Sequence, residues 1–458
     1  MFFRQILYRD LGCASYFIAC GGEAVVVDPR WDIDEYLELA RAERFRIAHV
    51  LDTHDHADHV SGRDRLVRAT GAQGHRAARP ADRQEADIGP GEEIVIGNVR
   101  LRALAVPGHR PEHLAFVVID GVRGADPWMV LTGDSLLVGD LARPDLVEDA
   151  GAGAATLHGS LQQLLDLGDH VEVWPAHIGG SLCGGAGLSG KASSTIGYER
   201  AHNPLLRMDE SEFVENLVSG IAVRPPNIQR IVGLNRDGDH GGPGEVPQLG
   251  AEALSELVEG AAVTMLDARP PDAFDAGHIS GAINLPVGSP GVGTRAGWVL
   301  GADQPILVVA EGEAMAARMA SLLHAVGLWN TIAWSEADLA AWSSHGAPIT
   351  QAGSVDVDQL AEALRQDLMY LVDVREDPEW VSGHVEGSHH VPLHCLREIS
   401  SVGLPRNGKP TAVACAAGIR AAFAASLLRR AGFHDVVRVA GGGVPDLEGR
   451  GIELTPGE

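Results

Sequence analysis

Residues Thr53 to His59 read THDHADH and directly follow the apolar run IAHVLD, so they lie where a strand is expected to end in a loop. Within six residues this stretch holds four potential metal ligands: His54, His56, Asp58 and His59. Neutral imidazole and carboxylate are the ligands that zinc, iron and manganese prefer, and close spacing lets one loop present several of them to one ion. A solvated loop has no reason to collect them, so the stretch predicts a metal site at the end of a strand.

Three further potential ligands follow later strand-like runs. His109 stands in VPGHRPEH, Asp134 in LTGDSLLVGD and His177 in WPAHIGG. If each strand of a sheet sandwich delivers one side chain to the same edge, a metal at that edge can collect them. Together with the first cluster they make seven positions, which is enough for one metal ion or for two.

The first cluster matches in full the HxHxDH signature of the metallo-β-lactamase superfamily, which the sequence resembles over about its first 235 residues. The resemblance implies an αββα sandwich whose metal lies in the cleft between two sheets. Short β-rich runs, such as EIVIGNVRLRALAVPGH and WMVLTGD, alternate with helical patterns, as in such an α/β domain. At the N-terminus, YFIAC and AVVVDP are expected to be two strands joined by Gly21 and Gly22.

Two longer stretches, TGDSLLVGDLARPDL and GKASSTIGYERAHNPLL, resemble the persulfide dioxygenases within that superfamily. This resemblance implies one Fe(II) held by His54, His109 and Asp134. Two histidines and one carboxylate are also the ligands of non-haem iron oxygenases, which keep open positions for oxygen and substrate. The remaining candidates would then orient the ligands and the water of the cleft, or hold a second metal: His56, Asp58, His59 and His177.

Two neighbours of this predicted centre are candidate substrate contacts. Arg143, in LARPDL, matches the position at which the family places an arginine that contacts the thiol carrier; the alternative is a surface arginine. Cys183 lies six residues after His177 in the glycine-rich stretch GGSLCGGAGLSG. It resembles an extra cysteine of multidomain bacterial enzymes that make thiosulfate from thiol persulfides. It either receives a sulfane sulfur near the metal or is an inert thiol.

A duplication follows the first domain. LDARPPDAFDAGHISGAINLP is answered by LVDVREDPEWVSGHVEGSHHVP. Asp267 and Asp373 are 106 residues apart, and so are Gly277 and Gly383. Coinciding offsets across an alternating strand and helix pattern predict two copies of a parallel-sheet α/β domain.

The stretch NRDGDHGGPGEVP, Asn235 to Pro247, is rich in Gly, Asp and Pro and is expected to hold no regular element. The predicted linker is therefore 236–247. It separates a metallo-β-lactamase-like domain from the two copies, and the predicted domains are 1–235, 248–350 and 351–458.

The second copy contains AVACAAGIRAAFAASLLRRAG, an apolar strand that runs into a helix with Cys415 at the junction. Backbone N–H groups from Ala416 to Ile419 and the helix N-terminus can stabilise a thiolate or persulfide anion there. The block resembles the rhodanese family, whose active loop CxxGxR is matched by Cys415, Gly418 and Arg420. The resemblance implies that Cys415 is a sulfur-carrying nucleophile and that the other two residues contact its substrate.

The first copy has a different loop. Alignment of SLLHAVG with SLLRRAG puts Ala310, Glu313 and Met315 at the positions of those three residues. Without a thiol the first copy cannot carry sulfur, so we expect it to be a spacer, a packing surface or an oligomer contact. Cys395, in VPLHCLREI, has no comparable setting and is expected to pack in a core.

Composition excludes several classes of partner. The 36 basic and 62 acidic residues give a net charge of −26, which repels nucleic acid and anionic membranes. Five scattered cysteines are too few for a disulfide framework, and the N-terminus lacks the pattern of a secretory signal. No apolar run approaches the roughly 20 residues of a spanning helix. We expect a cytoplasmic homo-oligomer that binds neither nucleic acid nor membranes.

The predicted function is oxidation of a thiol persulfide by O2 at a mononuclear Fe(II) site, which releases sulfite and thiol. Cys415 would then transfer a second sulfane sulfur to or from sulfite, through thiosulfate. One alternative is a dinuclear thioester hydrolase similar to glyoxalase II, although the sequence after His177 lacks the separate helical domain of that family. The other is a non-oxidative sulfur carrier. The sequence does not identify the carrier thiol, and zinc can replace iron in a preparation.

Overall fold

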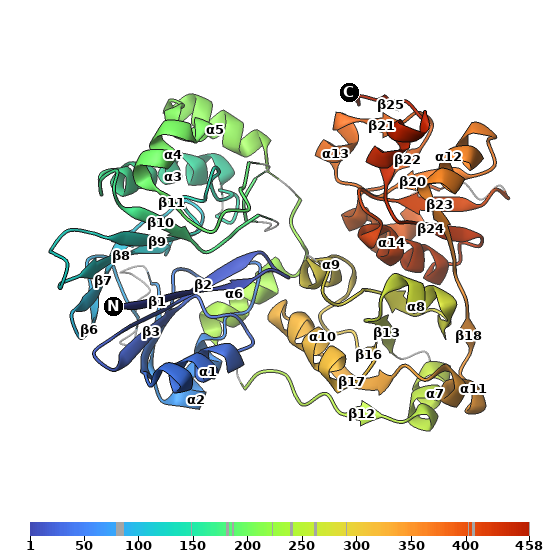
Figure 1. Ribbon diagram of the computed structural model, residues 1–458, viewed down its shortest axis with the longest axis horizontal. Helices are drawn as coiled ribbons and strands as arrows, with labels where there is room; N and C mark the ends of the chain where they lie inside the picture. Colours follow the sequence, from blue (N-terminus) through green and yellow to red (C-terminus); the bar gives the residue numbers. More distant parts are fainter. Residues whose placement is uncertain are drawn as a thin grey trace. The chain divides into compact units, whose positions relative to one another are not determined.

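A computed structural model describes residues 1–78, 87–147, 149–179, 183–185, 187–221, 223–238, 241–260, 263–289, 291–401, 403–404 and 408–457. The chain divides into two compact units. The first consists of Met1–Gly242 with His324–Gly327, and the second of Pro243–Leu323 with Leu328–Glu458. In Figure 1 most of the first unit is coloured blue to green and most of the second yellow to red.

The first unit is built on two β-sheets. The first sheet has the order β1-β2-β3-β4-β5: β1 (Phe2–Tyr8), β2 (Cys13–Cys20), β3 (Glu23–Val27), β4 (Arg46–Asp52) and β5 (Gln73–Arg76). The second has the order β11-β10-β9-β8-β7-β6: β6 (Glu93–Ile96), β7 (Val99–Ala105), β8 (Leu114–Asp120), β9 (Met129–Gly133), β10 (Glu172–Pro175) and β11 (Ser194–Thr195). Both sheets mix parallel and antiparallel neighbours.

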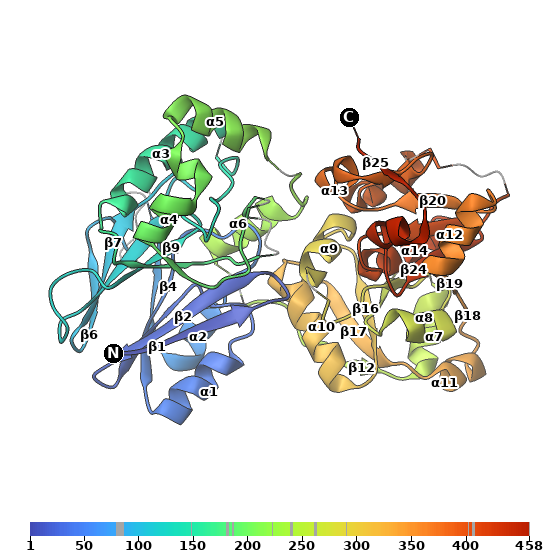
Figure 2. The ribbon, with the colours of Figure 1, turned by 45° about the horizontal axis from the view of Figure 1, so that its top comes forward.

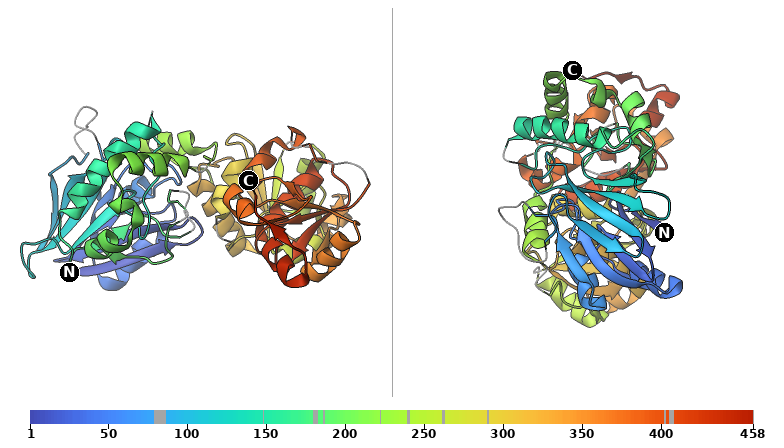
Figure 3. Two further views of the ribbon diagram at one scale, coloured as in Figure 1. Left: turned by 90° about the horizontal axis from the view of Figure 1, so that it is seen from above. Right: turned by 90° about the vertical axis from the view of Figure 1, so that its left-hand side faces the viewer.

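Helices cover the outer face of each sheet (Figures 1 and 3). Buried residues of β1 to β4 pack against α1 (Asp34–Glu43) and α2 (Arg63–Thr70). Buried residues of β8 to β10 pack against α3 (Ala150–Leu165), α4 (Ile196–His202) and α5 (Glu210–Ser219). A third cluster, with Tyr16 and Phe116, fills the space between the two sheets. The layers are therefore helix, sheet, sheet and helix, which confirms the predicted αββα sandwich.

The N-terminal strands form as the sequence predicts. β2 and β3 pair antiparallel around Gly21 and Gly22, whose φ angles of 65° and 88° suit the tight turn. The helices that follow β10, including η1 (Pro204–Arg207), build no separate domain, because Phe213 of α5 belongs to the core of the sandwich. Among the described residues, no helix is long and apolar enough to cross a membrane.

The expected linker begins too early. Helix α6 (Ile228–Asp237) extends three residues into Asn235 to Pro247. The side chain of Asn235 is buried, accepts a hydrogen bond from the backbone N–H of Ser61, and donates to the carbonyls of His56 and His59. These tertiary contacts outweigh the local Gly and Asp content. Residues 239 and 240 of the expected linker lie outside the described residues.

The second unit contains two five-stranded sheets whose neighbours all pair parallel. The first has the order β12-β17-β16-β13-β15: β12 (Gln248–Leu249), β13 (Thr264–Asp267), β15 (Ile283–Asn284), β16 (Ile306–Ala310) and β17 (Thr331–Glu336). The second has the order β19-β24-β23-β20-β22: β19 (Gly353–Asp356), β20 (Tyr370–Asp373), β22 (His389–His390), β23 (Thr411–Ala414) and β24 (Val436–Ala440). The two orders are equivalent, as the duplication predicts.

Helices surround each sheet (Figure 2), and each copy has one small two-stranded ladder. The first copy has α7 (Ala251–Glu259), α8 (Pro271–Ala276), α9 (Val292–Val299), α10 (Glu313–Ala325) and α11 (Leu339–Ser344), with β14 (His278–Ile279) paired to β18 (Ile349–Thr350). The second has α12 (Val357–Arg365), α13 (Asp377–Ser382), η2 (Leu393–Ser401), α14 (Ile419–Arg430) and η3 (Val444–Arg450), with β21 (His384–Val385) paired to β25 (Leu454–Thr455).

The residues that repeat in the two copies form the same buried ion pair. Arg375 binds Asp373 through Nε and Nη2 at 2.7 to 3.0 Å and donates to the carbonyl of Gly383 at 2.8 Å. In the first copy, Arg269 makes the same contacts with Asp267 and with the carbonyl of Gly277. The 106-residue repeat therefore marks an ion pair that ties β13 and β20, each next to an edge strand, to the turn after the following helix.

The strand registers also relate the two loops. Val309 pairs with Asp267, and Ala414 pairs with Asp373. Ala310 and Cys415 are the next residues along β16 and after β23, so Ala310 occupies the place that Cys415 holds in the second copy.

Asp373→Ala should destabilise the second copy, because Arg375 would be left as a buried cation without its carboxylate. Removing one partner of a buried pair costs about 3–5 kcal/mol. The matched control is Glu362→Ala, which removes the exposed partner of Arg365 and should cost about 0.5 kcal/mol or less. Hydrogen exchange of the β20 and β23 amides in the full chain measures both. Equal protection in the two variants would contradict a structural role for the repeated pair.

Candidate metal centre and sulfur-transfer loop

Three buried ligand atoms converge at the ends of three strands. His54 follows β4, His109 follows β7 and Asp134 follows β9, and all three side chains are 0% exposed. Asp134 Oδ2 lies 3.7 Å from His54 Nε2 and 3.3 Å from His109 Nε2. None of these three atoms has a hydrogen-bond partner among the described residues. A buried polar atom without a partner costs about 1–3 kcal/mol, so three together indicate a site made for a cation.

The position of His54 is held by a relay that begins at Asp28. Asp28 accepts hydrogen bonds from the backbone N–H of Thr53 (2.7 Å) and from its hydroxyl (3.0 Å). The Thr53 oxygen lies 2.9 Å from His54 Nδ1 and accepts its proton, because the hydroxyl proton is directed at Asp28. His54 therefore presents the lone pair of Nε2 to the site, as a metal-binding histidine does.

The other two ligands are oriented in the same way. His109 Nδ1 donates to the carbonyl of Arg143 (2.9 Å), which leaves its Nε2 as an acceptor. Asp134 uses Oδ1 to accept from His177 Nδ1 (2.6 Å), which leaves Oδ2 toward the two histidines. Gly133, with φ of 54°, lets the end of β9 approach Thr53, because a Cβ at this position would overlap Thr53 Oγ1.

The protonation states suit metal binding. Burial, followed by the neighbouring His56, lowers the pKa of His54 well below its usual value, and burial also lowers the pKa of His109. Burial alone would raise the pKa of Asp134, but His177 outweighs it and holds the pKa below its usual range. Two neutral imidazoles and one carboxylate are the forms that bind a divalent cation.

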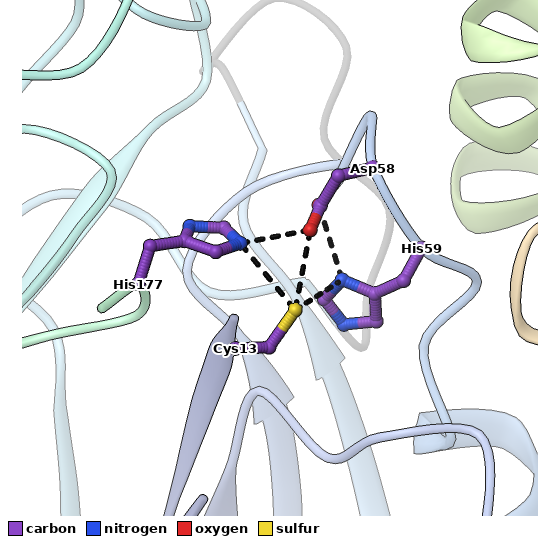
Figure 4. A group of neighbouring side chains, drawn as sticks. All are labelled: Cys13, Asp58, His59 and His177. Carbon is purple, nitrogen blue, oxygen red and sulfur yellow. Dashed lines mark hydrogen bonds and ion pairs between the residues drawn. The ribbon is translucent and has the colours of Figure 1, made fainter. Parts of the chain in front are cut away.

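A second group of side chains lies beside the first (Figure 4). Asp58 Oδ2 is 2.8 Å from His177 Nε2 and 3.2 Å from Cys13 Sγ, and Asp58 Oδ1 is 3.1 Å from His59 Nδ1. Cys13 Sγ also lies 3.5 Å from His177 Nε2. Burial would lower the pKa of His177, but the carboxylates of Asp134 and Asp58 raise it well above its usual value. His177 thus joins the two groups as an imidazolium between two carboxylates.

Sequence reasoning missed Cys13. The backbone N–H of Ala14 donates to the carbonyl of Ala176 (2.6 Å), which brings the start of β2 against the end of β10 and sets Cys13 beside His177. Only the tertiary fold creates this contact. Asp28 was also missed, although its place at the end of AVVVDP is the same strand-end signal that found the later ligands.

Two histidines near the centre do not converge with the three ligand atoms. His56 Nε2 donates to Asp28 Oδ1 at 3.1 Å, away from Asp134. His113 Nε2 accepts the backbone N–H of Asp134 at 3.1 Å. His56 thus bonds the Asp28 carboxylate, while its Nδ1 is buried without a partner among the described residues, and His113 holds the end of β9.

The two predicted substrate contacts lie next to each other. The backbone N–H of Arg143 donates to the carbonyl of Cys183 at 2.9 Å. Arg143 is buried, not a surface residue, and its guanidinium binds both oxygens of Asp145 at 2.6 and 2.9 Å. Burial, together with Asp134 and Asp58, raises the pKa of Cys183 well above its usual value. Residues 180–182 and 186 of this glycine-rich stretch lie outside the described residues.

Cys415 lies at the junction of β23 and α14 and is 2% exposed. The backbone N–H of Gly418 donates to Cys415 Sγ at 3.1 Å. Gly418 is the N-cap of α14 with φ of 87°, a left-handed conformation that glycine adopts without strain. The loop therefore directs a backbone donor and a helix N-terminus at the sulfur.

Arg420, the other charged residue of the CxxGxR motif, has an acidic partner. Arg420 forms two hydrogen bonds with Glu379, at 2.6 and 2.7 Å, a partner that sequence reasoning did not find.

The expectation that Cys395 packs in a core is wrong, because its side chain is exposed in η2. Its apolar neighbours in the sequence, Leu393 and Leu396, take the buried positions. All five cysteines are free thiols.

Residues 8–177 match the metallo-beta-lactamase superfamily, and residues 250–345 and 356–448 match the rhodanese-like domain. Hydroxyacylglutathione hydrolase of Anaeromyxobacter dehalogenans (strain 2CP-C) is 31% identical over 223 residues, which are 43% of this chain and 82% of that protein. The mitochondrial persulfide dioxygenase of Mus musculus is 27% identical over 215 residues, which are 46% of this chain and 78% of that protein.

A solved structure is similar over a larger part of the chain. The crystal structure of a metallo-beta-lactamase from Staphylococcus aureus subsp. aureus COL has a TM-score of 0.65 and 29% identity, and the match covers 73% of this chain and 98% of that chain. The sandwich and the duplicated parallel sheets agree with these matches. The chain therefore belongs to the metallo-β-lactamase superfamily and carries two rhodanese-like domains after its metallo-β-lactamase domain.

Proposed function

We propose that this protein is an iron(II) persulfide dioxygenase whose product is passed to a sulfur-transfer site at Cys415. The observation that carries the proposal is the set of three buried ligand atoms, His54 Nε2, His109 Nε2 and Asp134 Oδ2, which have no partner among the described residues. Two histidines and one carboxylate leave coordination positions open, as non-haem iron oxygenases require. Iron(II) held there would supply a redox-active centre at which a thiol persulfide and O2 react.

The proposed reaction is balanced by water. One thiol persulfide anion, one O2 and one water give one thiol, one sulfite and one proton, so the sulfane sulfur is oxidised and O2 is reduced. The chain's own residues keep the ligands in place during this reaction. Thr53 and the carbonyl of Arg143 fix the two imidazoles, and His177 fixes the carboxylate of Asp134. We assign substrate contact to Arg143 and Cys183, which are neighbours at the edge of this centre.

The rhodanese loop would use the sulfite. A persulfide on Cys415 loses its outer sulfur to sulfite, which forms thiosulfate and returns the Cys415 thiolate. Gly418 N–H, 3.1 Å from the sulfur, stabilises that anion. Together the two sites would link persulfide oxidation to the formation or the consumption of thiosulfate. Fusion in one chain keeps a labile sulfur species at high effective concentration between the sites.

A dinuclear thioester hydrolase is the second candidate, because the side chains of Asp58, His59 and His177 gather beside the first centre with Cys13. The hydroxyacylglutathione hydrolase similarity points the same way. Against it, both ring nitrogens of His177 are already engaged by Asp134 and Asp58. A hydrolase would also give the rhodanese-like domains no sulfane sulfur to transfer.

His109→Ala should remove the bound metal, because two ligands cannot hold it in competition with water. Protein prepared without oxygen and loaded with iron(II) should contain about one iron per chain, and the variant should contain less than about a tenth of that. His170→Ala, which removes an exposed histidine, is the matched control. Two tightly bound metals per wild-type chain would overturn the mononuclear assignment.

The two candidate reactions differ in their requirement for oxygen. The iron-loaded protein should consume one O2 for each sulfite formed from glutathione persulfide and should not hydrolyse S-lactoylglutathione at a comparable rate. Cobalt(II) at one equivalent should show no sulfur-to-cobalt charge-transfer band, because Cys13 is not a ligand of the proposed site. Thioester hydrolysis with two metals bound, and no oxygen consumption, would favour the second candidate.

Cys415→Ser should abolish thiosulfate sulfurtransferase activity and leave persulfide-dependent oxygen consumption within about twofold of wild type, since Cys415 belongs to the other unit. Cys395→Ser is the matched control, because that thiol is exposed and lies outside the loop. If Cys415→Ser retained sulfur transfer, another thiol, such as Cys183, would be the nucleophile.

A further inference from the structure

The two rhodanese copies are joined by direct contacts between buried residues. The backbone N–H of Asn284 in β15 donates to Ser426 Oγ in α14 at 3.0 Å. Arg438 Nε in β24 donates to Asp275 Oδ2 in α8 at 2.6 Å, and both side chains are largely buried. The first copy therefore packs against the second, and one of its contacts is with α14, the helix that begins at the Cys415 loop.

Helix α9 of the first copy lies next to that loop. Both α9 and α14 pack against η2, and Figures 1 and 2 show α9 beside α14. Trp298 of α9 contacts the ring of His394 in η2, with ring centroids 5.2 Å apart. His394 Nδ1 lies 3.0 Å from Glu376 Oε2, at the start of the helix that holds Glu379. Glu379 binds Arg420 of the active loop.

Arg295 is the cation that α9 carries into this region. Its side chain is 9% exposed, and its Nη2 donates to Ser289 Oγ at 2.8 Å. Ser289 in turn donates to the carbonyl of Pro286, so the guanidinium is held by the first copy's own loop. A buried arginine that is fixed in this way loses little side-chain entropy when it binds an anion.

The electrostatic influences on Arg295 come from the second copy. Burial and, to a smaller extent, the positive charge of Arg420 lower the pKa of Arg295 to about 10, while the Cys415 sulfur acts in the opposite direction. The pKa of Arg420 is raised above its usual value, because Glu379 outweighs the effect of burial, and Cys415 adds to that rise. The buried Arg295 of the first copy and the partly exposed Arg420 of the second thus both lie within electrostatic range of the Cys415 sulfur.

We infer that Arg295 of the first rhodanese copy forms, with Arg420 and the Cys415 loop, a shared site for a sulfur oxyanion such as sulfite or thiosulfate. This assignment rests on the proposed sulfur transfer at Cys415 and extends it. In the transfer step the S–S bond of the Cys415 persulfide breaks as sulfite attacks the outer sulfur. Thiosulfate leaves and the negative charge stays on Cys415. Arg295 would neutralise charge on the entering dianion, which the acidic chain otherwise repels.

This role gives the first copy a function that needs no thiol of its own. Ala310 replaces the nucleophile there, yet the neighbouring loop keeps Ser289 and Arg295 in place. The second copy contributes the sulfur and the first contributes a fixed guanidinium. Deletion of the first copy should then impair oxyanion binding as well as packing.

The test compares Arg295→Gln with wild type, with Arg295→Lys and Ser289→Ala as graded variants and Arg318→Gln as the matched control. Arg318 is an exposed arginine of the same copy. The KM for thiosulfate in sulfur transfer should rise about tenfold in Arg295→Gln, and less in Arg295→Lys and Ser289→Ala. Oxygen consumption with glutathione persulfide should stay at the wild-type rate in all variants.

A second readout separates charge recognition from a change of structure. Alkylation of Cys415 by anionic iodoacetate and by neutral iodoacetamide is followed by mass spectrometry of its peptide in the full-length protein. The ratio of the two rates should fall about tenfold in Arg295→Gln and stay unchanged in Arg318→Gln. An unchanged ratio and an unchanged KM would overturn the shared site. Absence of sulfur transfer in wild type would instead refute the proposed function, and the alkylation ratio would still test Arg295.

Discussion

The arrangement of the first unit depends on three polar atoms, at the ends of strands β4, β7 and β9, that are buried and have no partner in the part of the chain that the structure describes. Each would cost about 1–3 kcal/mol if nothing bound it. The neighbouring residues do not remove this cost, because they bond the other atom of each side chain. Thr53 bonds Nδ1 of His54, the carbonyl of Arg143 bonds Nδ1 of His109, and His177 bonds Oδ1 of Asp134. A fold that orients all three lone pairs at one point is organised around a cation.

His177 determines how the second group of potential ligands relates to this point. It lies between Asp134 and Asp58, and its raised pKa reflects the two carboxylates. Protonated His177 donates one hydrogen bond to Asp134, in the first group, and one to Asp58, in the second group. Cys13 completes the second group and distinguishes it chemically from the first, because a thiol selects softer ions than two imidazoles and a carboxylate do. The first unit thus contains a buried group of two histidines and one carboxylate, and beside it a group that includes a thiol.

Much of the fold and of the first ligand set could be predicted from sequence because the signals are local. HxHxDH, PGH and TGD each follow a strand, and the duplicated Asp and Arg residues report an ion pair within three positions. What could not be predicted depends on long-range contacts. Cys13 meets His177 across 164 residues, and Asn284 of the first copy meets Ser426 of the second. Asn235 extends α6 into an apparent linker for the same reason.

The central claim is that the first unit oxidises a sulfane sulfur with O2 rather than hydrolysing a thioester. The most direct measurement is a single-turnover experiment on anaerobic, iron-loaded protein carrying Cys415→Ser, to which glutathione persulfide and then a limiting amount of O2 are added. The account predicts that sulfite forms in an amount equal to the O2 consumed and that none forms before O2 is added. Sulfite formation without oxygen, or oxygen consumption without sulfite, would contradict it.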